Sequence, residues 1–232
     1  ANGTPSQSIV IAGYPGDARP VIDIPPSWNA QGFIVDWRAS HTPYYWTLRD
    51  FDIEGINQTY PSACLALSGP NVTVDNLVIR NCPRDGIQAF SQSLTVRNSS
   101  ILNCGRDQPP ADTDTKGVGI YFSLDDDPAN GGIGGDGVFE DNVIDGCRAG
   151  GVVIHYDTYN TIVRRNILRN FGLDSPWSPP SGFQQYGTGV TIGGAGTLGT
   201  TGPMNTLVYN NLIAHGSGVN GNAQCFILWG SQ

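Results

Sequence analysis

Apolar residues return at fixed intervals along most of the chain. In the segment TVRNSSILNC, Ile101 follows Val96 by five residues and Cys104 follows it by eight, with polar residues between them. The same pattern recurs in five other segments, the last with glycine in its third place, whose first apolar residues are Leu48, Val74, Phe139, Val163 and Val208. The regular steps between copies are 22 to 26 residues, and two steps are nearly doubled. An internal repeat of this length is typical of a solenoid.

Within each copy, short runs of alternating apolar and polar residues predict three strands rather than a helix. One strand of each set follows a glycine, as in the segments that begin at Gly86, Gly119, Gly151 and Gly189. Strands that return in the same direction once per coil pair with their equivalents in the next coil. The repeat therefore predicts parallel sheets wrapped around a continuous core, which is a parallel β-helix.

The two doubled steps predict coils that carry long insertions on both sides of the glycine-led strand. Neither insertion between Val96 and Phe139, at 105–118 and 125–137, alternates as a strand does. A second pair of insertions flanks the segment around Val190. Long loops on a rigid scaffold are where function usually lies, so we expect a groove over the sheet of glycine-led strands.

Two kinds of residue are expected to stack in columns inside the helix. Asn142, Asn166 and Asn211 occupy the same place in successive copies, and stacked asparagines hydrogen-bond along turns. Cys82, Cys104 and Cys147 form a second such column. Strand spacing permits a disulfide there, but a reduced, buried ladder is the favoured interpretation because free cysteine packs as a small hydrophobe.

Composition narrows the class of protein. The 232 residues fit one domain, with a net charge of −8 and a single lysine against eleven arginines, which argues against nucleic acid as a partner. No apolar run reaches the roughly 18 residues that a membrane span requires, so no membrane partner is expected either. The strands start within a few residues of one end and stop mid-coil at the other. We therefore expect residues 1–232 to be one domain of a longer chain, or the ends to be covered by another subunit.

The segment IVIAGYPGDARPVID, followed by repeats of the VxNNxIxxC type, resembles the secreted right-handed parallel β-helix proteins. That superfamily includes pectate-lyase-like and alginate-lyase-like polysaccharide lyases, polygalacturonase-like hydrolases and phage tailspikes. The repeat itself predicts an all-β solenoid of three sheets and about seven coils, and the resemblance implies that the helix is right-handed. The resemblance also implies an extracellular or cell-surface protein whose partner is a polysaccharide.

Strand alternation and the insertions select the candidate site residues. The outward positions of the glycine-led strands place Tyr121 and His155 in adjacent coils, with acidic residues and the single lysine in the flanking insertions. The catalytic candidates are His155, Tyr121, Asp126, Asp157 and Lys116. Aromatic residues offer stacking surfaces for sugar rings. The substrate-binding candidates are Phe90, Gln88, Trp177, Tyr186 and Arg106.

A calcium site is the one cofactor that the sequence suggests. Residues 112–117 copy the opening of a calcium-binding loop, with glycine in its sixth place. The match then fails, because Lys116 and Ser123 occupy places where ligands belong. The expected ligands are Asp112, Asp114 and Asp125.

Several functions remain open at this point. The favoured one is a polysaccharide lyase or a related uronate-modifying enzyme, which needs a base and a group that neutralises the uronate carboxylate. A glycoside hydrolase would need two carboxylates, for which Asp157 and one of the residues 125–127 are the candidates. A non-catalytic carbohydrate-binding or adhesin module, or a purely structural spike segment, would need no catalytic group. Fold alone does not choose among them.

Overall fold

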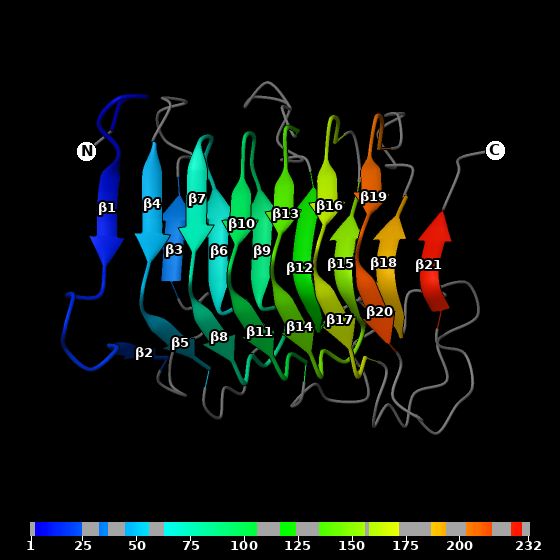
Figure 1. Cartoon of the computed structure of the whole chain (residues 1–232), viewed down its shortest axis with the longest axis horizontal. Helices are drawn as coiled ribbons and strands as arrows, with labels where there is room; N and C mark the ends of the chain where they lie inside the picture. Colours follow the sequence, from blue (N-terminus) through cyan, green and yellow to red (C-terminus); the bar gives the residue numbers. More distant parts are fainter. Residues whose placement is uncertain are drawn as a thin grey trace.

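The strands form three seven-stranded parallel sheets that wrap around one core (Figure 1). The computed structural model describes residues 3–24, 33–36, 45–55, 63–105, 117–123, 135–155, 158–171, 187–193, 203–214 and 224–228, and side chains at 33–36, 224 and 227 are not described. Every element of the described ranges is a strand, and no helix that could span a membrane occurs among them. The predicted three-sheet solenoid of about seven coils is confirmed.

We name the sheets in chain order. The first sheet consists of β1 (Ile9–Ala12), β4 (Trp46–Arg49), β7 (Val72–Asp75), β10 (Thr95–Arg97), β13 (Val138–Glu140), β16 (Ile162–Arg164) and β19 (Leu207–Tyr209). The second sheet consists of β2 (Val21–Asp23), β5 (Asp52–Glu54), β8 (Val78–Arg80), β11 (Ser100–Leu102), β14 (Val143–Asp145), β17 (Ile167–Arg169) and β20 (Leu212–Ala214). The third sheet consists of β3 (Phe33–Asp36), β6 (Leu65–Ser68), β9 (Ile87–Phe90), β12 (Val118–Ser123), β15 (Gly150–Ile154), β18 (Thr188–Ile192) and β21 (Gln224–Leu228).

The register of the first sheet follows the repeat that the sequence shows. Val96 pairs with Val74 on one side and with Phe139 on the other, so the doubled step is one coil with insertions, as predicted. A seventh copy precedes the six that the sequence revealed, because Ile11 pairs with Leu48. The next inward residue of this copy is Ile22, which pairs with Ile53. Ile22 follows Ile11 by eleven residues instead of five, because the corner between the two strands is longer. A search for fixed spacing therefore misses this copy.

The inward side chains stack into apolar columns that fill the helix. The residues predicted to face the core from the third sheet are all fully buried, namely Ile87, Ala89, Ile120, Phe122, Val152 and Ile154. We call the residues that take the places of Val96 and Ile101 in the other copies Val96-type and Ile101-type residues. Together with these residues, the inward side chains of the third sheet form one continuous cluster. Burial of this apolar surface is the main term that stabilises the fold.

Left-handed residues make the corner between the first and second sheets. In the six copies that the sequence revealed, the second residue after the position equivalent to Val96 has a positive φ, as at Asn98 with 51° and Asn76 with 54°. Asparagine and aspartate tolerate this conformation better than other side chains that carry a Cβ. The exception is Arg165, whose guanidinium bonds to the carboxylate of Asp141 in the preceding coil. The corner therefore uses a left-handed residue directly before the predicted asparagine column.

The predicted asparagine ladder runs through the residue that follows the left-handed one. Asn142 Nδ2 donates to Asn166 Oδ1 at 3.0 Å, and Asn166 Nδ2 donates to Asn211 Oδ1 at 2.9 Å. The backbone N–H groups of Asn142 and Asn166 donate to the same oxygens. Ser99 continues the ladder toward the N-terminus, because its N–H donates to Asn142 Oδ1. The ladder thus satisfies buried polar groups of four coils.

Glycine occupies the beginning of the third-sheet strands, just before β9 at Gly86 and as the second residue of β12 at Gly119, because there is no room for a side chain. A Cβ on Gly119 would lie 2.4 Å from Cγ2 of Ile144 and 2.8 Å from the carbonyl oxygen of Gly151. The same contacts recur one coil earlier, where a Cβ on Gly86 would lie 2.4 Å from Cγ2 of Ile101. The glycine column lets the third sheet approach the Ile101-type column closely.

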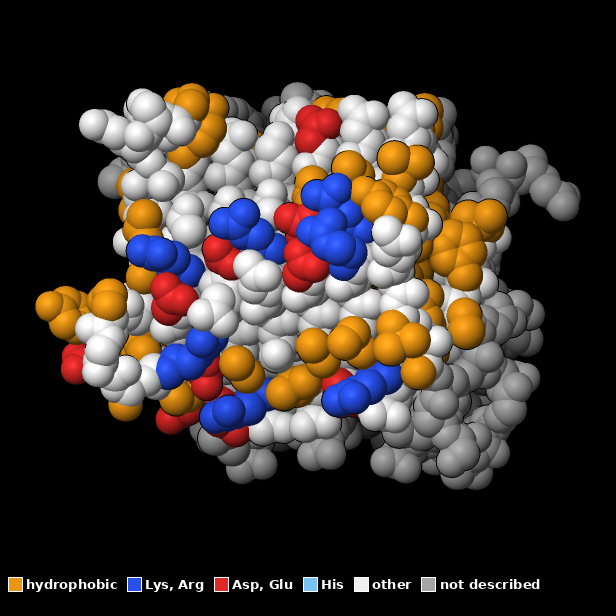
Figure 2. Space-filling model, in the orientation of Figure 1, with side chains coloured by type: hydrophobic (Ala, Val, Ile, Leu, Met, Phe, Trp, Pro, Cys, Tyr) orange, Lys and Arg blue, Asp and Glu red, His pale blue; other side chains and the backbone are white. Residues whose placement is uncertain are grey.

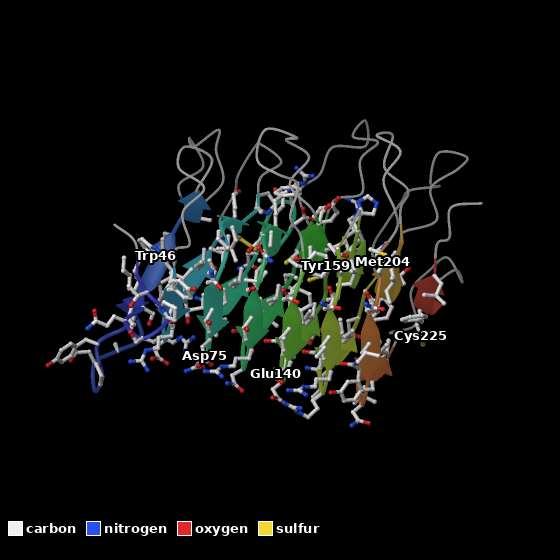
Figure 3. The ribbon with its side chains drawn as sticks, turned by 90° about the horizontal axis from the view of Figure 1, so that it is seen from above. Trp46, Asp75, Glu140, Tyr159, Met204 and Cys225 are labelled. Atoms are coloured by element: carbon white, nitrogen blue, oxygen red, sulfur yellow. A yellow bond between two sulfur atoms is a disulfide. The ribbon has the colours of Figure 1, made fainter. Side chains whose placement is uncertain are left out.

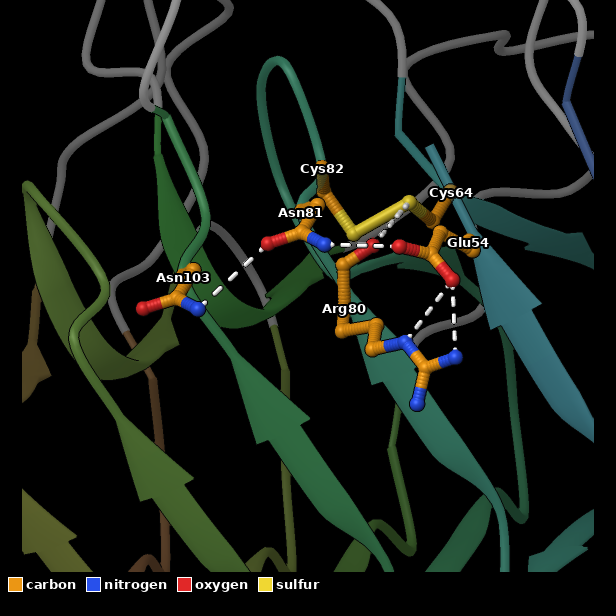
Figure 4. The surroundings of a disulfide bond; sticks show 6 residues. All are labelled: Glu54, Cys64, Arg80, Asn81, Cys82 and Asn103. Atoms are coloured by element: carbon orange, nitrogen blue, oxygen red, sulfur yellow. Dashed lines mark hydrogen bonds and ion pairs between the residues drawn. A yellow bond between two sulfur atoms is a disulfide. The ribbon is translucent and has the colours of Figure 1, made fainter. Parts of the chain in front are cut away.

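The cysteine column is partly oxidised, which corrects the sequence interpretation. Cys82 forms a disulfide with Cys64, which occupies the place in its coil that Gly86 takes in the next (Figure 4). The expectation that Cys82 belongs to a reduced ladder is therefore wrong. Cys104 and Cys147 are free and buried, as predicted. Burial, and then the hydrogen bond to Cys147, raises the pKa of the Cys104 thiol.

The outer faces of the first and second sheets carry pairs of opposite charge between adjacent coils. Figure 2 shows basic and acidic side chains side by side over this surface, and Asp75 and Glu140 project away from the ribbon in Figure 3. The pairs include Arg97 with Asp75 at 2.9 Å and Arg169 with Asp145 at 2.8 Å. Pairs this exposed contribute little to stability, typically about 0 to 1 kcal/mol each.

Candidate functional site

The outer face of the third sheet brings four predicted site residues together. Gln88, Tyr121 and Val153 pair in register across β9, β12 and β15, so their side chains form a row perpendicular to the strands. Phe90 lies two residues beyond Gln88 on β9, and His155 directly follows β15. The side chains of adjacent strands lie about 4.8 Å apart, so this row is compact.

Tyr121 and His155 form a hydrogen-bonded pair at the centre of this face. The hydroxyl oxygen of Tyr121 lies 2.8 Å from Nδ1 of His155, and their ring centroids are 5.6 Å apart. Phe90 packs edge-on against Tyr121, with a centroid distance of 6.1 Å. Three aromatic rings from three successive coils therefore make one continuous surface.

Burial sets the protonation state of His155. Loss of solvent disfavours the imidazolium and lowers the pKa of His155 to about 4. The imidazole is consequently neutral at pH 7, with one ring nitrogen able to accept a proton. In the tautomer whose Nδ1 is unprotonated, the Tyr121 hydroxyl donates to that nitrogen across the 2.8 Å hydrogen bond.

The face points outward, as alternation predicts, but most of it is not open to solvent. Gln88 and His155 are each 8% exposed and Val153 is 2% exposed, whereas Phe90 and Tyr121 are half-buried. Tyr121 also packs against a small apolar cluster of Val118, Ala149 and Val153, separate from the main core. Of the Tyr121–His155 pair, Tyr121 is therefore the more accessible partner.

The long insertions join the two strands that flank β15. We call the residues at which an insertion joins the sheet its stem. In the sequence, residues 106–116 come directly before Gly117 and β12, and residues 124–134 follow Ser123 at the other end of that strand. Residues 172–186 likewise come directly before Gly187 and β18, and residues 194–202 follow Gly193. β15, which leads into His155, pairs with β12 on one side and β18 on the other. The Tyr121–His155 pair thus lies between the attachment points of both sets of insertions.

Nine of the predicted site residues lie outside the described ranges. These are the catalytic candidates Asp126, Asp157 and Lys116, the substrate-binding candidates Trp177, Tyr186 and Arg106, and the calcium candidates Asp112, Asp114 and Asp125. Within the described ranges, no group of three His, Cys, Asp or Glu side chains is arranged to hold a metal ion. Calcium binding stays a prediction.

Sequence reasoning missed Asp85, a fully buried carboxylate that lies just before β9 of the third sheet. Its Oδ1 accepts the backbone N–H groups of Gly117 and Val118 at 2.9 and 3.1 Å. A signal was present in the sequence, because an aspartate directly precedes a glycine that leads into a core strand. A charged residue at such a position needs internal partners, and here they are backbone groups where the chain returns from an insertion.

Comparison with known proteins identifies the family. The family model for the right-handed beta helix region matches residues 54–213, which is more than half of the chain. The chain belongs to the right-handed β-helix family. No curated protein matches its sequence.

A solved structure of this β-helix fold shows the same arrangement. The crystal structure of an alginate lyase from Paenibacillus sp. str. FPU-7 superimposes with a TM-score of 0.57 over 96% of this chain, at 21% sequence identity. The chain spans 66% of that protein's length. At this identity the likeness establishes the fold, and the chemistry has to be argued from the residues of this β-helix chain.

Proposed function

We propose that this β-helix protein is an extracellular polysaccharide-active enzyme, specifically a lyase that acts on uronate-containing chains over the outer face of the third sheet. The observation that carries the proposal is the Tyr121–His155 pair, 2.8 Å apart, beside the ring of Phe90. The structural likeness to an alginate lyase supports the substrate class. The Cys64–Cys82 disulfide supports an oxidising, extracellular location.

In this mechanism Tyr121 contacts the sugar, and His155 accepts a proton from the hydroxyl of Tyr121. The pair removes the proton from the carbon next to the uronate carboxylate. The electron pair of that bond forms a carbon–carbon double bond, and the bond from the neighbouring carbon to the glycosidic oxygen breaks. The leaving oxygen takes up the proton that the pair has removed, so the step balances. Neutral His155 can accept the proton from Tyr121, which an imidazolium could not, and the negative charge of a bound uronate offsets the burial that disfavours the imidazolium so formed.

The half-buried rings of Phe90 and Tyr121 suit the binding step. Their faces and edges offer apolar surface to the C–H groups of a sugar ring, while the tyrosine hydroxyl and the amide of Gln88 offer hydrogen bonds. These same features would serve a module that binds polysaccharide without cleaving it. That module is the second candidate, and product formation distinguishes the two.

The test is to incubate the protein with pectin, alginate and glycosaminoglycans and to follow the ultraviolet absorbance of the unsaturated uronate. We expect product from at least one uronate polymer. Tyr121→Phe removes only the hydroxyl, so kcat should fall by roughly 100-fold or more with little change in KM. The matched control is Tyr14→Phe, which alters an exposed tyrosine in the turn between β1 and β2 and should leave kcat unchanged.

Two results would contradict the lyase proposal. Full activity in folded Tyr121→Phe would remove the pair from the mechanism. Retardation of the protein by one polysaccharide without any product from it would support the binding module instead. Shortened chains that lack the double bond would point to a hydrolase.

A further inference from the structure

The buried carboxylate of Asp85 is aimed at the backbone and not at the core. Asp85 lies just before Gly86 and β9 and is fully buried. Besides the two N–H groups that its Oδ1 accepts, Nε of Arg84 lies 3.2 Å from its other oxygen. Hydrogen bonds to an ionised carboxylate are among the strongest in proteins. A charge this deeply buried is retained only where such partners hold it in place.

The two N–H groups mark the point where the chain rejoins the third sheet after the insertion at 106–116. Gly105 and Gly117 are both left-handed, with φ of 81° and 100°. A Cβ on Gly105 would lie 2.6 Å from Cα of Gly117, so the backbone leaves and returns at one place. Asp85 therefore fastens the returning end of a closed stem.

The same hydrogen-bonded column reaches the stem of the next insertion. The carbonyl oxygen of Gly117 accepts the N–H of Ala149 at 2.9 Å, and the carbonyl oxygen of Ala149 accepts the N–H of Gly187 at 2.9 Å. Gly187 is left-handed as well, with φ of 78°, and it is where the chain returns after residues 172–186. Gly117 and Gly187 therefore lie in one row of backbone hydrogen bonds, which runs across the third sheet where its strands begin. Asp85 lies in the same row, one coil before Gly117.

We propose that Asp85 is a positioning residue, which fixes the stems at Gly117 and Gly187 on either side of β15 and so sets the geometry in which a polysaccharide meets Tyr121. This inference rests on the function proposed above. Asp85 is not a catalytic residue in this arrangement, since it acts through the backbone at the start of β12. Tyr121 lies four residues after Gly117 on the same strand segment, so a displacement of Gly117 would be transmitted along β12 to the Tyr121–His155 pair.

The experiment compares Asp85→Ala and Asp85→Asn with the wild-type protein in two measurements. Amide hydrogen exchange at Gly117 and Val118 reports the stem directly, and it should accelerate by roughly 10- to 100-fold in Asp85→Ala. The KM for the polysaccharide, or its Kd, should rise by about 10-fold in the same variant. Asp85→Asn keeps an acceptor oxygen and should restore most of both values. The matched control, Asp145→Ala on the second sheet, loses an exposed ion pair and should change neither.

The outcomes separate this inference from the proposed function. Unchanged exchange at Gly117 and Val118 in Asp85→Ala would overturn the positioning role, as would faster exchange with unchanged polysaccharide affinity. If Asp85→Ala does not fold, Asp85→Asn decides. Wild-type exchange together with wild-type affinity in this variant would support the role of the acceptor oxygen. Accelerated exchange with normal affinity would overturn it. If the wild-type protein neither binds nor cleaves any polysaccharide of the panel, the proposed function fails. The inference falls with it, while the exchange data still show whether Asp85 holds the stem.

Discussion

At the scale of single residues, the environment of His155 makes stability depend on pH. Its pKa is lowered to about 4 in the folded protein, against about 6.5 in an unfolded chain. The unfolded state therefore binds more protons between these values. No penalty exists above pH 6.5. As the pH falls, the penalty grows and is complete below about 4, where it amounts to about 3 kcal/mol.

His155→Gln tests this linkage because glutamine does not titrate. Urea unfolding at pH 7 and pH 4 should show a smaller loss of the unfolding free energy on acidification in the variant than in the wild-type protein, by about 2 to 3 kcal/mol. Other groups titrate in both proteins, so only the difference between them reports His155. Equal losses in both would mean that folding does not lower the pKa of His155.

At the scale of the elements, the asparagine ladder joins neighbouring coils more firmly than the surface ion pairs do. Asn166→Ala leaves the buried N–H of Asn142 and the carbonyl oxygen of Phe139 without their side-chain partner. We expect a loss of about 2 to 4 kcal/mol in the unfolding free energy, measured with urea. Arg169→Ala, which breaks an exposed pair with Asp145, is the control and should cost less than about 1 kcal/mol. Comparable losses in both variants would contradict this ranking.

Strand register was readable from the sequence because the inward columns impose a fixed apolar spacing. Val74, Val96 and Val163 follow that spacing and lie in one sheet in register. Cys64 broke the glycine pattern of its position, and only the structure shows that this place brings it against Cys82. The repeat shows which residues stack between coils, and the disulfide joins two different positions within one coil. Repeat spacing therefore predicts the strand register but not the Cys64–Cys82 bond.

The candidate site was readable only in part. Period-two alternation correctly turned Tyr121 and His155 outward and into adjacent coils. It could not give their burial, because alternation tells which face of the sheet a side chain lies on and not how much solvent reaches that face. Nor could it reveal Asp85, whose partners are backbone N–H groups 32 and 33 residues away.

At the scale of the whole molecule, the paired strands hold the coil together without the insertion at 106–116. Because Gly105 and Gly117 already meet, replacing residues 106–116 by one or two glycines should leave the β-helix folded. Circular dichroism should retain the β-sheet spectrum, and the urea midpoint should shift only slightly. Polysaccharide cleavage should be lost if the insertion contributes to the site.

Loss of the β-sheet spectrum in the shortened protein would contradict this prediction, since it would show that the insertion is part of the core. The control is a chain in which residues 106–116 are replaced by eleven glycine and serine residues. It keeps the length while removing the native side chains, so it separates a need for connection from a need for sequence.

The placement of β15 between β12 and β18 has a consequence for how this protein can diversify. The insertion before β12 joins the sheet on a closed stem, where Gly105 and Gly117 meet, and the insertion before β18 joins it at Gly187 in the same hydrogen-bonded column, so both can be exchanged while the stacked interior stays untouched. If the proposed function holds, natural variation or laboratory grafting at these two junctions would change which polymer is recognised while the Tyr121–His155 pair stays in place.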